Sequence, residues 1–533
     1  MPTKERSQTP NRVRAYKPKV KTGCITCRIR HKKCDETKPH CQRCISTGRK
    51  CDGYLSTPSS SNNSPSPSKI TPLPKPQFKG NDLERRSFDF FCKRTVLTLS
   101  GIFDPTFWTR LVLQATHHEP AIRHAVVALG ALHETSELGS REGPSIFALQ
   151  QYGKAMGCLI NSTPEEKKRA ADVALMTCVL FVCFEIMREH HGTAISHIES
   201  GVKIISSLQS GVESTDTWSL SRSPYAEPSI LNPIFIRLDR QVSEITFRRK
   251  RQLLDHVLDD KVSGYHTNIP MTFTSLEQAR NSLDHIRTLS VRFMKKAMPD
   301  PSFRDPAKKA LTLDVLKTSS FIRLQQWSTA FNSFIRYHGD FDTTGQEAVH
   351  VLKMHRIFMG IVMGVDEERS FADETVWDQY KPQYEAIVAH ATSVIELKTR
   401  DCETEGRKRA TFNLDSGINF PLIFVASKCR DGAIRRKAIQ LLRTMDRYEG
   451  IWNSILSARV AERLISIEEK GLVGEEEFLK ASEIPNENRL GGAETRWMTD
   501  RRVQMIYTRK GRMIIGGDSY QGGNVVMEEL LEW

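Results

Sequence analysis

The chain has 533 residues and a formal net charge of +14 at neutral pH. This length is too great for one compact core and predicts a small module joined to one large domain or two medium ones. Residues 1–54 hold fifteen Lys and Arg against four Asp and Glu, a net +11, so the other 479 residues carry only +3. Charge gathered at one end favours nucleic-acid binding over a generally basic protein, and no amphipathic apolar face accompanies it to suggest a membrane surface.

Residues 1–22 form a basic arm. Its cations alternate with neutral positions and with no regular apolar pattern, at Arg12, Arg14, Lys17, Lys19 and Lys21. We expect a disordered arm that serves as a nuclear import signal or adds phosphate contacts, and a merely solvated tail is the simpler alternative.

Residues 23–54 contain six cysteines in two matching triplets. Each triplet reads Cys, two residues, Cys, six residues, Cys, and the second repeats the first at a constant offset: Cys24, Cys27, Cys34, Cys41, Cys44 and Cys51. Structural zinc takes four ligands in a tetrahedron, usually thiolate or imidazole. Six thiolates suit one zinc with two left over, or two zincs if one cysteine of each half bridges both metals. The repeat favours the second, symmetrical solution.

Two other uses of these cysteines are disfavoured. A disulfide framework belongs to small secreted chains, whereas this sequence opens with a charged arm that lacks the apolar core of a signal peptide. An ordinary four-ligand finger completed by His31 or His40 would leave thiolates unused in each half.

Residues 24–51 resemble the fungal six-cysteine binuclear zinc cluster, the DNA-binding module of a large class of fungal transcription factors. The resemblance lies in both cysteine triplets, in the basic run between the second and third cysteines, and in Pro39, two residues before the fourth. It implies two Zn²⁺ ions with Cys24 and Cys41 as the bridging ligands. It also implies that Arg30 and His31 contact bases, usually in a CGG triplet.

The two halves of the cysteine repeat differ in charge. The first carries Arg28, Arg30, His31, Lys32 and Lys33 in its loop, and the second carries only Arg43, Arg49 and Lys50. A helix docked in the major groove can aim a cation at guanine O6 and N7 while its neighbours hold phosphates. We therefore expect the first half to read DNA.

Residues 55–80 hold six prolines and seven serines in twenty-six positions, which predicts a disordered linker. No heptad pattern follows the cysteines, so a coiled-coil dimer is not expected. A homodimer would instead form through the domain that follows.

Residues 81–533 have the composition and the apolar spacing of a helical domain. Helices are expected near 120–132, 173–184, 195–205, 276–297, 312–337, 346–364, 377–398, 417–428, 431–447 and 451–469. Strand-like alternation is confined to Val503, Met505 and Tyr507, and Arg435, Arg436 and Lys437 are expected to form a solvated helix face. The predicted fold is mostly α: a small N-terminal binuclear zinc cluster module joined by a disordered linker to a large all-α regulatory domain.

Two stretches of this domain, 128–134 and 429–452, are similar to the helical regulatory region that accompanies the zinc cluster in many fungal regulators. The last stretch, 525–533, mixes acids with bulky apolar groups. That composition suits a short activation segment that folds onto coactivators, and it suits a terminal helix docked on the domain equally well.

The sequence holds no Gly-rich phosphate loop, Gly-x-Ser-x-Gly elbow or His-Glu-x-x-His motif, so we do not expect an enzyme. We predict a nuclear, sequence-specific transcription factor of the fungal RNA polymerase II type. Double-stranded DNA is the expected partner, and a second copy of the chain, coactivators and a small-molecule effector are further candidates. The alternatives are a zinc-thiolate metal or redox sensor whose cluster occupancy is the signal, and a DNA-independent scaffold with a vestigial cluster.

Overall fold

In the computed structural model the chain divides into two compact units, Met1–Gln77 and Phe78–Trp533. The structure describes residues 22–54, 78–103, 105–137, 146–160, 169–210, 218–221, 223–245, 268–297, 306–366, 373–405, 411–444, 447–474, 476–498, 502–509 and 524–532. The basic arm up to residue 21 and the linker over 55–77 lie outside the described residues, so their expected disorder stays a prediction.

The small unit contains two short helices, α1 (Ile25–Ile29) and α2 (Gln42–Ile45), which both begin directly after a cysteine. In the described part of this unit, the buried side chains that pack together are Cys24, Cys27, Cys41, Cys44 and Cys51. This unit has too few apolar side chains for hydrocarbon burial alone to keep its roughly thirty described residues folded.

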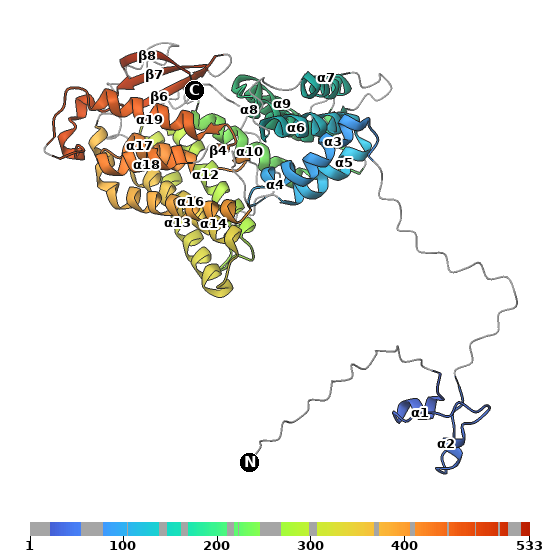
Figure 1. Ribbon diagram of the computed structural model, residues 1–533. Coiled ribbons are helices and arrows are strands. Elements are labelled where there is room, and N and C mark those ends of the chain that lie inside the picture. Colours follow the sequence, from blue (N-terminus) through green and yellow to red (C-terminus); the bar gives the residue numbers. More distant parts are fainter. Residues whose placement is uncertain are drawn as a thin grey trace, which may run out of the picture. The chain divides into compact units, whose positions relative to one another are not determined.

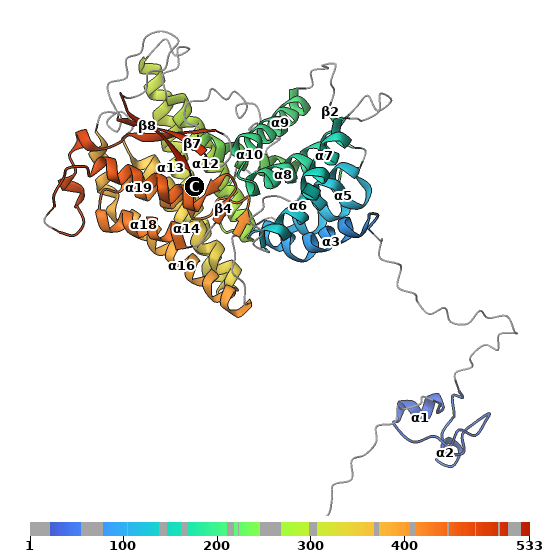
Figure 2. The same ribbon diagram turned by 45° about the horizontal axis from the view of Figure 1, so that its top comes forward.

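The large unit is an array of helices whose first part surrounds α8 (Ala171–Met187). This part comprises α3 (Asp82–Phe90), a π-helical turn η1 (Phe91–Thr95), α4 (Val96–Leu99), a second such turn η2 (Phe107–Leu111), α5 (Val112–His118), α6 (Pro120–Glu137), α7 (Ile146–Ile160), α9 (His191–Ser210) and α10 (Pro228–Ile245). Because α8 is apolar on every side, all its residues from Ala171 to Ile186 are buried. It packs against α6 and α9 (Figure 2).

The second part of the large unit has a separate apolar core. Its elements are α12 (Leu276–Ala297), α13 (Pro306–His338), α14 (Thr343–Gly364), the 3₁₀ helix η3 (Glu374–Tyr380), α16 (Lys381–Glu405), α17 (Asn419–Lys428), α18 (Gly432–Thr444) and α19 (Ser454–Glu468). Trp327 of α13 lies at the centre of this core, and its indole N–H donates to the Ala279 carbonyl at 2.8 Å.

Buried charges join the two parts where α10 meets α12. Arg240 lies 2.9 Å from Asp284, and Arg287 pairs with Glu244. Burial, reinforced by the adjoining Arg287, lowers the pKa of His355 to about 3. The neutral ring therefore accepts from Arg287 at 3.0 Å through Nδ1 and donates to the Gly417 carbonyl at 2.8 Å through Nε2.

Short strands complete the large unit. β1 (Arg169–Ala170) pairs in parallel with β2 (Trp218–Ser219), and β3 (Thr411–Asn413) pairs in parallel with β4 (Arg447–Glu449), which is antiparallel to β5 (Trp452–Asn453). A larger antiparallel sheet has β7 (Arg502–Arg509) between β6 (Gly492–Trp497) and β8 (Asn524–Glu532), and it lies on α19 (Figure 1).

The mostly α fold is confirmed, and each expected helix is present. The alternation of Val503, Met505 and Tyr507 is confirmed as well, since all three are buried from β7 against α19. The helices α3, α5, α7 and α10 and the sheet itself were not foreseen. Among the described helices, none is both long and apolar enough to span a membrane.

The terminal helix suggested for 525–533 is wrong, because residues 525–532, the described part of this stretch, lie in the edge strand β8. Its apolar period is interrupted by Glu529, whose carboxylate accepts from Arg463 at 2.9 Å and from the Tyr507 hydroxyl at 2.9 Å. An acid on the inward face of a strand conceals the two-residue alternation from sequence inspection.

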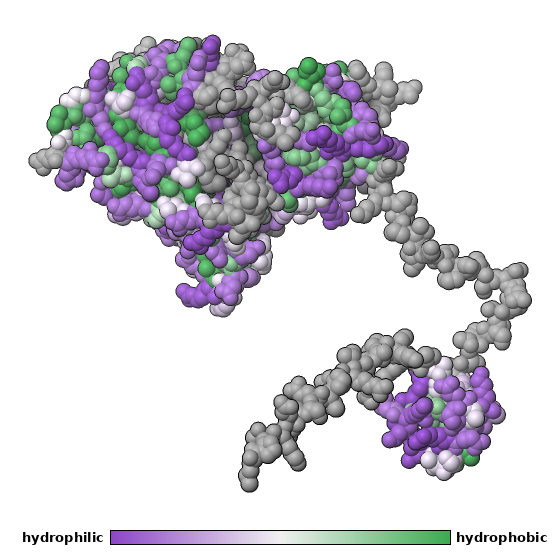
Figure 3. Space-filling view, in the orientation of Figure 1, coloured by the Kyte–Doolittle hydropathy of each residue, from purple (hydrophilic) through white to green (hydrophobic). Residues whose placement is uncertain are grey.

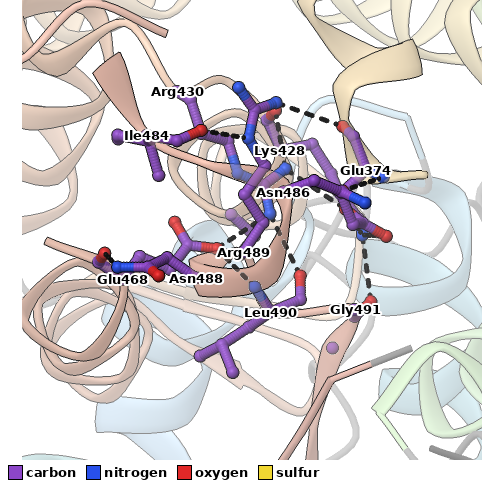
Figure 4. A network of polar contacts seen from close by, with 12 residues as sticks. Glu374, Lys428, Arg430, Glu468, Ile484, Asn486, Asn488, Arg489, Leu490 and Gly491 are labelled. Atoms are coloured by element: carbon purple, nitrogen blue, oxygen red, sulfur yellow. Dashed lines mark hydrogen bonds and ion pairs between the residues drawn. The ribbon is translucent and has the colours of Figure 1, made fainter. Parts of the chain in front are cut away.

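The expectation that Arg435, Arg436 and Lys437 form a solvated helix face is also wrong for Arg435. Arg435 is fully buried and donates to Glu468 of α19 at 2.8 Å and to the Ala426 carbonyl at 3.2 Å. Arg430 binds the other oxygen of the same carboxylate at 2.8 Å (Figure 4). Arg436 pairs with Glu469 at 2.6 Å, and Lys437 is exposed as expected.

We expect Glu468→Gln to destabilise the full-length protein by about 3–5 kcal/mol, because it leaves two buried guanidinium groups without their shared counter-charge. The matched control is Glu462→Gln. Its partner Arg443 also links α18 to α19, but both side chains are more than 40 % exposed (46 % and 42 %). That substitution should cost under about 1 kcal/mol. Urea unfolding followed by circular dichroism measures both, and equal losses would contradict the assignment.

The contacts of Glu468 with Arg430 and Arg435 also predict that the stability of the protein depends on pH. Burial opposes ionisation of Glu468, yet Arg430 and Arg435 hold its pKa below the ordinary value. A lowered native pKa contributes stability that is fully present above the unfolded value of about 4.3 and is lost as the pH falls below it. The wild-type protein should therefore lose stability in this range more steeply than Glu468→Gln.

Candidate zinc and nucleic-acid site

The six predicted cysteine ligands lie together at the centre of the small unit. Two overlapping groups of four have all their sulfur atoms within 4.8 Å of one another: Cys24, Cys27, Cys34 and Cys41, and Cys24, Cys41, Cys44 and Cys51. Cys24 and Cys41 are the two members common to both groups, and their sulfurs are 3.5 Å apart.

The sulfur spacing fits zinc. A tetrahedral site with zinc–sulfur bonds of 2.3 Å has sulfur–sulfur edges of about 3.8 Å. Within the first group Cys27 Sγ lies 3.7 Å from Cys41 Sγ, and within the second Cys24 Sγ lies 3.9 Å from Cys44 Sγ. The residues present therefore match the donor type and the spacing that structural zinc requires.

Backbone N–H groups point at four of these sulfurs in a repeated pattern. The N–H of Cys24 donates to Cys34 Sγ at 3.4 Å, and the N–H of Cys41 donates to Cys51 Sγ at 3.5 Å. In each half the second cysteine likewise donates to the sulfur of the first, at 3.4 and 3.3 Å. Such donors favour the thiolate form, which is the form that binds metal.

The pKa values of the cysteines differ from one position in the cluster to another. Burial raises the pKa of Cys24 and Cys27 to about 12, so a cation beside them is needed to hold them ionised. Burial also acts to raise the pKa of Cys34. There, however, the N–H groups of Cys24 and Glu36 donate hydrogen bonds that outweigh burial and lower the pKa to about 6. At Cys51 the N–H of Cys41 lowers the pKa to about 7.

The backbone repeats with the sequence, including its unusual turns. His31 ends the turn after α1 with φ of 51°, and its counterpart seventeen residues later is Gly48, with φ of 64°. Glu36 and Gly53 form a second such pair, with φ of 63° and 72°. Left-handed backbone is unfavourable for a residue with a Cβ, and in the first half both His31 and Glu36 adopt it where the second half has glycine.

One side chain fastens the two halves together. Asp35, which follows the first triplet, accepts from the backbone N–H groups of Gln42 at 3.1 Å and Arg43 at 2.7 Å in the first turn of α2. Hydrogen bonds from Thr37, Arg43 and Gln42 lower its pKa to about 2. The carboxylate thus satisfies N–H groups that the helix itself cannot use.

The predicted DNA-contacting residues lie at the end of α1 and just beyond it. Arg28 is in the helix, Arg30 caps it, and His31, Lys32 and Lys33 follow. Arg30 is half-buried and the other four are exposed. The face of this unit drawn in Figure 3 is mostly hydrophilic, with a few apolar patches.

Comparison with known proteins agrees with this geometry. Residues 22–60 match the fungal Zn(2)-Cys(6) binuclear cluster domain, and residues 86–253 match the fungal specific transcription factor domain. The chain therefore resembles the fungal zinc-cluster transcription regulators in both of these domains. These matches support a DNA-binding transcription regulator that binds zinc, and they confirm the expectation that the protein is not an enzyme.

Some of the relatives match this protein along most of their length. It is 25 % identical to the aspercryptin biosynthesis cluster-specific transcription regulator atnN of Emericella nidulans, over 94 % of this chain and 96 % of that one. It is 27 % identical to the transcription regulator lscL of Purpureocillium lilacinum over 64 % and 86 %. A segment of 38 residues, 7 % of this chain and 8 % of the relative, is 60 % identical to the transcriptional regulatory protein moc3 of Schizosaccharomyces pombe. No solved structure matches.

The pairing of His31 with Gly48 predicts opposite effects of two substitutions. Gly48→Ala should weaken the folded module by about 1 kcal/mol, because an alanine Cβ disfavours left-handed backbone although the space around Gly48 is open. His31→Gly should leave the module as stable as before or stabilise it by up to about 1 kcal/mol. Competition with a chelator for zinc reports both, since metal binding and folding are linked. Loss of zinc from His31→Gly would show that the imidazole supports the fold.

Proposed function

We propose that this protein is a nuclear transcription factor that reads CGG-like triplets through the first half of its zinc module. The observation that carries the proposal is the contrast between the two halves. Their backbones repeat, yet the first presents Arg28, Arg30, His31, Lys32 and Lys33 where the second has Ile45, Thr47, Gly48, Arg49 and Lys50.

The metal site in this proposal holds two Zn²⁺ ions through six thiolates. Cys27 and Cys34 would complete one tetrahedron and Cys44 and Cys51 the other, with Cys24 and Cys41 shared. Zinc supplies the positive charge that keeps the buried thiolates ionised and fixes the fold around them. The chain's own N–H groups hold the sulfurs in place, and Asp35 keeps α2 against the first half.

The DNA-reading surface is the C-terminal end of α1. Arg30 would donate to guanine O6 and N7 in the major groove, and His31 would place a ring N–H against a neighbouring base acceptor. Arg28, Lys32 and Lys33 surround them and would hold phosphates. Both base-reading residues stand where the helix has ended, so their side chains can project beyond its last turn.

The remaining parts follow from the same proposal. Residues 1–22 would be a basic arm, 23–54 the zinc module, 55–80 a linker and 81–533 the regulatory domain. Any homodimer would form through that domain, and coactivators or a small-molecule effector would act there. In the alternative function, that of a zinc or redox sensor, cluster occupancy would itself be the signal, and DNA preference would not depend on Arg30.

Zinc stoichiometry tests the shared ligands. The full-length protein should hold two zinc ions, and Cys34→Ala should retain more zinc than Cys24→Ala, because loss of a terminal ligand disturbs one metal and loss of a shared ligand disturbs both. Native mass spectrometry counts the ions. A wild-type protein with one zinc, or equal losses from the two variants, would refute the shared-ligand arrangement.

Selection of bound sites from random DNA tests the reading surface. Arg30→Ala should lose about 1–3 kcal/mol of discrimination at one base pair. Arg49→Ala, in the second half, removes the same charge and should weaken all sequences evenly, reducing the log–log salt slope by up to about one unit. His31→Gly should lose preference at a second base pair while keeping zinc. Unchanged preference in Arg30→Ala would overturn the assignment of the first half as the reader.

A further inference from the structure

The last residue of α1 is apolar and exposed. The Ile29 side chain is 72 % exposed among the cations at the end of this helix, and the proposed DNA reading gives it no part. Single apolar side chains are common on protein surfaces, so exposure alone assigns no role to this residue. What distinguishes Ile29 is its position on the helix.

Ile29 lies on the side of α1 that faces away from the sulfur cluster. Cys27 is buried in that cluster, and two residues of helix turn the direction of a side chain by about 200°. Arg30 caps the helix, and its N–H still donates to the Thr26 carbonyl at 3.2 Å. Arg28 and Arg30 therefore lie about 100° to either side of Ile29. A polyanion that both arginines contact would cover Ile29 as well.

The second half of the module has a polar residue at the equivalent position. Seventeen residues beyond Ile29 is Ser46, whose backbone is also helical, with φ of −63° and ψ of −21°. In both halves the N–H three residues further on donates to the carbonyl of the second cysteine, at 3.0 Å. The backbone of the module thus accepts serine at this position, and it does not require isoleucine there.

The neighbours of Ile29 restrict what it can contact. The guanidinium groups of Arg28 and Arg30 are permanently charged, which favours DNA over an apolar protein partner at this surface. The isoleucine side chain is shorter than that of arginine, so it reaches only groups that stand out from the edges of the bases. In the major groove the apolar group that stands out in this way is the 5-methyl group of thymine.

We propose that Ile29 determines specificity at a base pair beside the guanine that Arg30 reads, by packing against the 5-methyl group of a thymine. This inference rests on the proposed DNA-reading function and adds one residue and one base to it. Contact with one methyl group removes from water an apolar surface comparable to that of one CH₂ group, which corresponds to about a fourfold gain in affinity.

Selection of bound sites from random DNA by the zinc-loaded full-length protein is the first test. The wild type should select an A·T pair next to the triplet, with thymine always on the same strand. Ile29→Ser should lose this preference and keep the triplet. Ile45→Ser is the matched control, because Ile45 ends α2 and is 55 % exposed, and it should keep both preferences. A selected site without thymine beside the triplet would overturn the proposal.

Uracil isolates the contribution of the methyl group, because it pairs as thymine does and lacks only that methyl. With uracil at this one position, the wild type should bind about fourfold more weakly, whereas Ile29→Ser should bind the two DNAs equally. Equal binding of both DNAs by the wild type, or the same loss in Ile29→Ser, would overturn the proposal. The wild-type comparison needs no variant, so it decides the matter even if Ile29→Ser loses zinc.

The two measurements also separate this inference from the function on which it rests. If the triplet is selected and uracil has no effect, the role of Ile29 is refuted and the DNA-reading function stands. If no triplet is selected, both are refuted.

Discussion

The small unit depends on the packing of six sulfur atoms. Its buried cluster is made of cysteines, with Tyr54 at the edge, and hydrocarbon side chains contribute almost nothing to it. Thiolates at separations of 3.5–3.9 Å repel one another strongly in a buried setting, so the cysteines can be ionised in this arrangement only with cations among them. Metal charge thus does for the small unit what apolar burial does for the large unit, and folding of the small unit becomes conditional on bound metal.

The large unit solves a related problem with its own side chains. Arg430, just before α18, and Arg435, within it, share Glu468 of α19, and Arg240 and Arg287 meet Asp284 and Glu244 at the α10–α12 junction. Each set lies where one helix packs against another. Buried pairs add little net stability over apolar residues, but they penalise every packing that separates the partners. They therefore fix which helices adjoin.

The sequence revealed most where a pattern had a single physical solution. Ligand counting and the seventeen-residue repeat gave the cysteine cluster, and helical periodicity gave the long apolar helices such as α6 and α8. It failed where a residue acts through a distant partner. Arg435 looked solvated because nothing local discloses Glu468, thirty-three residues away, and β8 looked helical because Glu529 faces inward toward Arg463.

The repeat within the zinc module bears on how such a reader acquires specificity. Both halves use the same N–H···S bonds and the same left-handed turn, so the scaffold gives neither of them an advantage in contacting DNA. Specificity must then lie in the side chains that differ between equivalent positions. At the two left-handed positions the second half has glycine, the residue suited to that backbone, whereas the first half has His31 and Glu36. Of these two residues, only His31 adjoins Arg30 and two lysines, so His31 is the left-handed residue that the proposed reading surface includes.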